Sequence, residues 1–106
     1  MAAIKLDIRD SGDSRKVVKT LETEGYNLMM GTVDDFMEIF DLDQLSDQKA
    51  ILKMIQKSYK QIKPLIMDIF PELTEEDYRN VSVQDLARTV VQVGTSIIDN
   101  INITKN

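Results

Sequence analysis

The first residues of the chain alternate between apolar and polar side chains. Ile4, Leu6 and Ile8 are separated by Lys5 and Asp7, a period of two that is typical of a strand with one buried face. Turn-forming residues follow at 10–13, and β-branched residues in 16–21 predict a second strand that returns beside the first. The segment 16–21 is also compatible with a short helix. Residues 1–24 are therefore predicted to form a β-hairpin or an arm.

The next patterned segment has the spacing of a helix. Val33, Phe36, Met37 and Phe40 fall at i, i+3, i+4 and i+7, which places them on one helical face. Thr32 precedes them and is of a type that commonly caps a helix N-terminus. We expect a helix that begins at Thr32, buries this apolar face and leaves its acidic side chains in water.

The strongest periodic signal begins after Ser46 and Asp47. Its apolar positions keep helical spacing from 51 to 69: Ile51, Met54, Ile55, Tyr59, Ile62, Leu65, Ile66 and Ile69. Pro64 interrupts this run, because proline lacks a backbone donor and its ring crowds the carbonyl four residues earlier. A break or kink near Lys63 is expected.

Two capping boxes follow Pro71. Thr74 with Asp77 and Ser82 with Asp85 have the spacing at which a hydroxyl caps a helix and an acid follows three residues later. An apolar stripe then continues to the C-terminus through Leu86, Val90, Val93, Ile97 and Ile101. Gly94 lies inside this last helix, and close approach of another backbone is one reason for a glycine there.

These patterns predict a mainly α fold, a small bundle of four to five helices with a short N-terminal β-hairpin as an option. A chain of 106 residues has room for one domain. Within 1–106 we expect the hairpin or arm at 1–24, a helical body at 25–102 and a tail at 103–106.

Composition narrows the choice of function. Apolar residues make up 42% and charged residues 29% of the chain, which is ordinary for a folded protein. The net charge of -5 repels phosphate backbones and anionic membranes, so neither nucleic acid nor a membrane is an expected partner. No apolar run approaches the roughly 18 to 20 residues of a membrane span, and no secretory signal is present at the N-terminus. A cytoplasmic protein is expected.

Candidate chemistry is sparse. The absence of histidine and cysteine excludes Ser-His, Cys-His and imidazole-metal sites, and the four scattered glycines form no phosphate-binding loop. Asp41 and Asp43 occupy the first and third positions of a calcium loop, but Leu45, Ser46 and Leu52 stand where such a loop needs an oxygen ligand, glycine and glutamate. We expect no enzyme activity and no cofactor.

Charges are segregated along the chain. Residues 34–47 contain six acids and no base, whereas residues 49–63 contain five lysines and no acid. Lys49, Lys53, Lys57 and Lys60 step by four, four and three, which predicts one basic ridge. The ridge is interpreted either as a docking face for an acidic partner or a neighbouring copy, or as a solubilising surface.

Methionine is frequent, and thioether side chains adapt to irregular partners. The methionines have two open interpretations: they line a groove for a partner helix, or they fill the core. The residues concerned are Met54, Met67 and the group Met29, Met30 and Met37. Exposure of that group of three as a single patch would favour the groove.

Four short segments occur in a familiar order. Residues 26–36 read YNLMMGTVDDF, 41–43 read DLD, 62–76 read IKPLIMDIFPELTEE and 81–86 read VSVQDL. In this order they resemble the tail assembly chaperones of siphophages and related prophages of Gram-positive bacteria, over about residues 26–98. The resemblance implies a non-catalytic protein of the host cytoplasm, absent from the mature virion, that coats the tape-measure protein and helps to recruit major tail (tube) protein.

On the basis of this resemblance, we expect apolar residues flanked by the basic ridge to contact the partner. Packing in the core is the alternative interpretation of each of these apolar residues. The predicted contact residues are Met30, Phe36, Phe40, Met67, Phe70, Lys49, Lys53, Lys57 and Lys60.

Two other classes of function stay open. A small acidic regulatory adaptor, of the anti-repressor or inhibitor type, would use residues 34–47 to bind a basic partner protein. A carboxylate-based metal enzyme would bind divalent ions tightly. A homo-oligomer is a further possibility, because an edge strand at 4–9 could pair with another copy.

Overall fold

The computed structural model describes the backbone of residues 3–105 and the side chains of 3–25 and 27–100. In chain order the elements are β1 (Ala3–Asp10), β2 (Asp13–Glu24), the 3-10 helix η1 (Gly25–Asn27), α1 (Met30–Ile39), the 3-10 helix η2 (Leu42–Gln44), α2 (Gln48–Lys57), α3 (Tyr59–Ile69), α4 (Glu75–Arg79) and α5 (Val83–Lys105). The prediction of a mainly helical fold with an N-terminal hairpin is confirmed.

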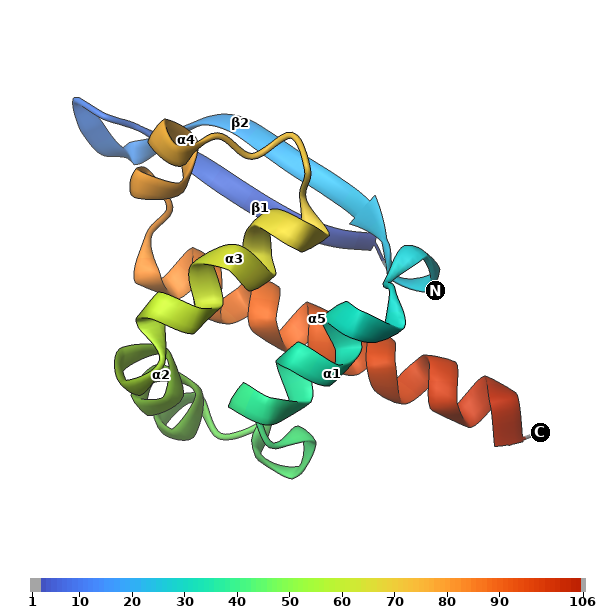
Figure 1. The fold of residues 1–106 in the computed structure, drawn as a ribbon. Helices are drawn as coiled ribbons and strands as arrows, with labels where there is room; N and C mark the ends of the chain where they lie inside the picture. The colour runs from blue at the N-terminus through green and yellow to red at the C-terminus, as the bar shows by residue number, and fades with distance from the viewer. Residues whose placement is uncertain (1–2, 106) are drawn as a thin grey trace.

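Helix α5 is the element on which the others are assembled. It packs against β1, η1 and α2, while α3 packs against both α1 and α2. Figure 1 shows α5 running behind α1 and α3 across the molecule, with its C-terminal end extending past the other helices. Among the described residues, no helix has the length and apolar character needed to cross a bilayer.

The hairpin belongs to the hydrophobic core. β1 and β2 are antiparallel, Leu6 lies opposite Leu21, and the strands are joined through the turn at 11–12. Ile4, Leu6 and Ile8 are at most 2% exposed, because the period of two directs all three to the face that packs on the helices. Of the two predicted forms for 1–24, the structure therefore has the hairpin and not a separate arm.

One continuous core joins the hairpin to the helices. Buried side chains come from both strands, from α1, α2, α3 and α5, and from the α3–α4 connection: Ile4, Leu6, Ile8, Leu21, Phe36, Phe40, Ile51, Ile55, Ile62, Leu65, Ile66, Ile69, Phe70, Leu73, Leu86, Ala87, Val90, Val93 and Ile97. The described residues thus form one packed unit.

The outer edge of β1 is bonded to the helices. The Lys5 N–H donates to Gln92 Oε1 at 2.8 Å, and the Thr89 hydroxyl donates to the Lys5 carbonyl oxygen at 2.7 Å. The Arg9 N–H donates to the Asn80 carbonyl oxygen at 2.9 Å. An edge strand normally presents unpaired backbone groups. Here the side of β1 away from β2 is partly occupied by α5 and the α4–α5 connection.

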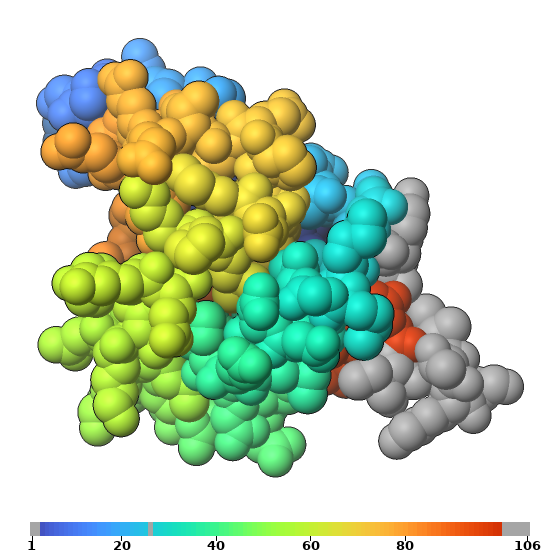
Figure 2. Space-filling view, viewed as in Figure 1, coloured from blue at the N-terminus to red at the C-terminus, as the bar shows by residue number. Residues whose placement is uncertain are grey.

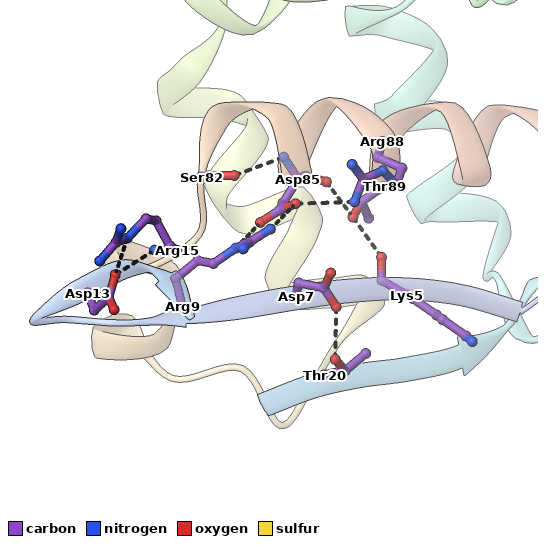
Figure 3. Close-up of polar contacts among 10 residues, drawn as sticks. All are labelled: Lys5, Asp7, Arg9, Asp13, Arg15, Thr20, Ser82, Asp85, Arg88 and Thr89. Atoms are coloured by element: carbon purple, nitrogen blue, oxygen red, sulfur yellow. Dashed lines mark hydrogen bonds and ion pairs between the residues drawn. The ribbon is translucent and has the colours of Figure 1, made fainter. Parts of the chain in front are cut away.

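A partly buried ion pair fixes the N-terminus of α5 against β1 (Figure 3). Arg9 Nε lies 2.8 Å from Asp85 Oδ2, and Arg9 Nη2 lies 3.1 Å from Asp85 Oδ1, a two-pronged contact on a carboxylate that is only 2% exposed. Arg88 and the Ser82 cap complete the cluster. The hydrogen bond from Arg9 lowers the pKa of Asp85 below its usual value, against the raising effect of burial.

The helix break lies upstream of its predicted position. The long periodic segment is divided at Ser58, whose φ of -122° and ψ of 23° end α2 and begin α3, and Pro64 lies inside α3. α3 is continuous through Lys63, so the expected break there is wrong, and the alternative of a kink at that position stays a prediction. Because proline deprives the carbonyl four residues earlier of its donor, the affected carbonyl is that of Lys60, in the first turn of α3.

Three further expectations are corrected by the packing. α1 begins at Met30 with Met29 as its N-cap, ahead of the predicted start at Thr32, and no side chain caps it. A Cβ at Gly94 would overlap the side chain of Leu45, so a side chain approaches this glycine and not a backbone. The predicted tail at 103–106 is helical as far as Lys105, and residue 106 lies outside the described residues.

Candidate partner-binding surface

Helix α1 has one buried face and one strongly apolar exposed face. Phe36 and Phe40 are 1% and 2% exposed, and their ring centroids lie 4.9 Å apart with a 34° angle between the rings. Met29, Met30 and Met37, in contrast, are 73%, 70% and 49% exposed. We call these three residues the methionine surface. The helical period sends the aromatic residues into the core, so the methionines are left in water.

The methionine surface follows a single helical face. Met30, Val33 and Met37 are spaced i, i+3 and i+7, and Val33, which is half-buried, connects the two exposed ends. At a rise of about 1.5 Å per residue, the distance along the axis from Met30 to Met37 is about 10 Å. Met30 and Met37 are therefore exposed on one helical face, about two helical turns apart, and Met29 is exposed at the N-cap of the same helix. Exposure of all three side chains favours a groove over core filling.

A hollow of about 530 Å³ adjoins Met37 where α1, η2 and α2 meet. Its lining residues are Met37, Glu38, Ile39, Phe40, Asp41, Leu42, Asp43 and Met54. Figure 2 shows α1 (teal) and the η2–α2 segment (green) meeting on the lower part of the viewed face. The lining combines apolar side chains with three carboxylates and includes Met37, so the hollow adjoins the methionine surface.

The structure divides the apolar residues predicted to contact a partner. Met30 is exposed and Met67 is half-buried, whereas Phe36, Phe40 and Phe70 are at most 3% exposed. The three phenylalanines are corrected to core residues, because aromatic side chains of this size bury a large apolar area. Phe36 and Phe40 hold α1 to the core, Phe40 also lines the hollow, and Phe70 packs in the core at the end of α3.

The predicted basic ridge is exposed, but the helix break interrupts it. Lys49, Lys53 and Lys57 lie on α2, and all are exposed. Lys60 lies beyond Ser58 on α3, where it lines a separate hollow of about 340 Å³ together with Asp35, Glu38 and Asp68 among others. Only the three α2 lysines therefore form one row.

The acidic segment lies beside the methionine surface. All six acids of 34–47 are exposed: Asp34, Asp35, Glu38, Asp41, Asp43 and Asp47. Asp41 caps η2 by accepting from the Asp43 N–H at 2.9 Å, and Asp47 caps α2 by accepting from the Lys49 N–H at 3.1 Å. Two of the acids thus have structural roles, and Asp34 and Glu38 lie on α1 beside the methionines.

No metal site emerges from these carboxylates. Within the part of the chain that the structure describes, no group of three or more histidine, cysteine, aspartate or glutamate side chains is arranged to hold a metal ion. The Asp41–Asp43 segment that begins like a calcium loop forms η2 instead.

Sequence reasoning missed the Arg9–Asp85 pair. Asp85 was expected only as the acid of a capping box, and that box forms, since the Asp85 N–H donates to Ser82 Oγ at 3.0 Å. Arg9 and Asp85 are separated by 76 positions, and local spacing carries no signal for a contact of that range. The pair holds the hairpin to α5 and lies apart from the methionine surface.

Comparison with known proteins provides no family assignment. No protein-family model, curated protein or solved structure matches this chain. The likeness to tail assembly chaperones stays a prediction from the four short sequence segments.

Proposed function

We propose that this chain is a non-catalytic phage tail assembly chaperone that binds the tape-measure protein and helps to recruit tail-tube subunits during tail morphogenesis. The observation that carries the proposal is the methionine surface, with exposures of 73%, 70% and 49% on one short helix and its N-cap residue. The sequence resemblance supplies the biological setting. The proposal places the protein in the host cytoplasm and outside the mature virion.

The methionine surface suits an amphipathic helix as a partner. A helix that docks in a groove presents apolar side chains at i, i+3, i+4 and i+7, and a stripe of about two turns accepts two or three of them. Methionine has a flexible, polarisable side chain, so one surface can accommodate successive segments of a long and variable partner. Phe36 and Phe40 hold α1 in place beneath it.

The expected affinity of one copy is weak. Complete burial of one methionine side chain contributes about 1.5–3 kcal/mol, and association has its own entropic cost. Many copies along one tape-measure protein would bind strongly together, and each could be displaced singly as the tail tube assembles. Weak individual binding therefore agrees with a chaperone that leaves the finished particle.

The charged side chains beside the hollow are acidic. Glu38, Asp41 and Asp43 are among its lining residues. Acidic groups beside an apolar groove favour a partner helix that carries basic residues along the same flank. A tape-measure segment with an apolar face flanked by basic residues is the expected ligand.

Capture of a tape-measure protein tests the proposal. Co-expression of the chain with a siphophage tape-measure protein should keep that protein soluble, and Met30→Glu/Met37→Glu should reduce capture by about 10-fold or more, because charges replace the apolar contacts. Val83→Glu is a control for one such charge on an exposed apolar residue, since Val83 is 58% exposed and lies on α5. The single variants Met30→Glu and Met37→Glu are its matched comparisons. Equal capture by the wild type and the methionine variant would contradict the proposed site.

The acidic adaptor is the second candidate, and the exposure of all six acids in 34–47 favours it. The two functions respond differently to substitution. An adaptor that binds a basic protein through charge would lose binding on Asp34→Lys/Asp35→Lys and would weaken steeply with salt. Binding to an amphipathic helix through the methionine surface would depend mainly on Met30 and Met37.

A further inference from the structure

The two edges of the hairpin differ. The outer edge of β1 is bonded to Gln92, Thr89 and Asn80. β2 spans Asp13–Glu24, and every side chain from Ser14 to Thr20 is exposed. In an antiparallel pair, every second residue of each strand directs its N–H and C=O away from the partner strand. The sheet has two strands in the order β1-β2, so β2 presents the open edge.

The open edge also carries exposed apolar residues. Val17 and Val18 are adjacent and are 40% and 54% exposed. The register shift between Ile8 and Arg9 leaves one of these valines as an extra residue opposite β1. β-branched side chains are favourable neighbours across paired strands. A further strand laid along β2 would cover both of them.

Charges along β2 are separated by sign. Arg15 and Lys16 lie toward its start, and Glu22 and Glu24 lie at its end. Lys19, near the middle of the strand, is paired with Asp77 at 3.0 Å. Asp13, at the turn, is already paired with Arg15 at 3.2 Å. Lysines on an edge normally discourage pairing with another strand. In an antiparallel pair of two β2 strands, however, the basic end of each strand lies beside the acidic end of the other.

We propose that two copies of this chain pair through β2, antiparallel, to form a four-stranded sheet in the order β1-β2-β2-β1. A twofold axis relates the copies, so one set of residues serves both halves of the interface. Two ionic contacts between basic and acidic ends therefore form together. The sequence predicted self-association through the edge of β1. That edge is partly occupied by α5, so we place the pairing at the edge of β2 instead.

This dimer is independent of the proposed chaperone function, since β2 and the methionine surface share no residue. A single pair of strands provides a smaller interface than the roughly 1,600 Å² of a standard stable complex. We therefore expect a weak dimer that forms as the protein concentration rises. In a particle-assembly setting, many copies on one partner would raise the local concentration and favour pairing.

Charge exchange tests the pairing. Lys16→Glu with Arg15→Glu makes the basic end acidic, and Glu22→Lys with Glu24→Lys makes the acidic end basic. Sedimentation velocity over a range of concentrations should show dimerisation weakened about 10-fold or more in each double variant, because like charges then meet. An equimolar mixture of the two double variants should recover the dimer, since opposite charges again meet.

A control variant and a measurement on β2 itself show whether the copies associate through β2. Asp68→Lys/Glu72→Lys carries the same change in charge as Glu22→Lys/Glu24→Lys at exposed positions outside the hairpin and should dimerise like the wild type. Amide hydrogen exchange in β2 should slow at high protein concentration, and circular dichroism confirms that each variant is folded. A monomeric wild type at all concentrations, or a dimer that survives both double variants, would overturn the proposal. Neither result bears on capture of a tape-measure protein.

Discussion

Two regions of the molecule contribute to the same core in different ways. One is the hairpin together with the start of α5, and the other is the segment from α1 to α2. Around β1, polar groups are matched internally: Arg9 with Asp85, Thr89 with the Lys5 carbonyl and Ser82 with the start of α5. Around α1, the core side is filled by Phe36 and Phe40, but the outer side leaves Met30 and Met37 in water. One region is closed by specific contacts, and the other keeps apolar surface available for a partner.

This difference shows how a small chain can combine a defined fold with an adaptable surface. Buried, hydrogen-bonded charges fix one arrangement, because an unpaired buried charge is costly. Exposed methionines do not require one fixed geometry, since their flexible side chains can pack against partners of several shapes. Substitutions in the first region should therefore change stability, and substitutions on the methionine surface should change binding.

The largest effect on stability is expected from Phe36→Ala. Phe36 is 1% exposed and contacts Phe40, so removal of its ring should lower the free energy of unfolding by about 3–5 kcal/mol. Met37→Ala, one residue later, should change it by less than about 0.5 kcal/mol. Urea denaturation of both variants measures the contrast. Equal losses would mean that α1 does not have one buried and one exposed face.

A smaller loss is expected from Asp85→Asn, which keeps the shape but removes the charge that binds Arg9. The free energy of unfolding should fall by about 2 kcal/mol at neutral pH. The same variant also tests how the contribution of the Arg9–Asp85 pair to stability depends on pH. The Arg9 hydrogen bond lowers the pKa of Asp85 relative to the unfolded chain. The stability from this pair is therefore present above the unfolded pKa and is lost as the pH falls through the lower folded pKa.

Acid titration of stability provides the measurement. Thermal melts from pH 7 downward should show the wild type losing stability below about pH 4 more steeply than Asp85→Asn. Asp77, whose pKa is lowered mainly by the hydrogen bond from Lys19, remains in both proteins and accounts for a shared residual slope. If stability fell equally with pH in both proteins, the Arg9–Asp85 pair would not be the source of the expected pH dependence.

The smallest effect on stability is expected on the methionine surface. Met30→Glu/Met37→Glu should change the free energy of unfolding by no more than about 0.5 kcal/mol, because both side chains are already largely in water. Differential scanning calorimetry checks this result. A large loss of stability would show that the methionines pack on the protein itself and would weaken their assignment as a binding surface.

Local pattern was sufficient for most of the elements. The hydroxyl caps at Thr74 and Ser82 form as predicted, and the alternation in β1 buries the expected residues. The spacing in α3 buries four of its five predicted apolar positions, but Tyr59, at the start of the helix, is 62% exposed. The start of α1 was misplaced because no side chain caps that helix. The candidate site was predicted only in part: Met30 and the α2 lysines are exposed, while three phenylalanines belong to the core.

The sequence by itself determined the short-range features: the hairpin turn, the capped helices, the apolar faces and the absence of histidine and cysteine chemistry. These depend on contacts within a few residues, where spacing and side-chain type decide the outcome. Tertiary structure decided which edge of the hairpin stays open, where α2 and α3 separate, and that Arg9 meets Asp85. Those features depend on residues far apart in the chain, brought together only when helix α5 packs along β1.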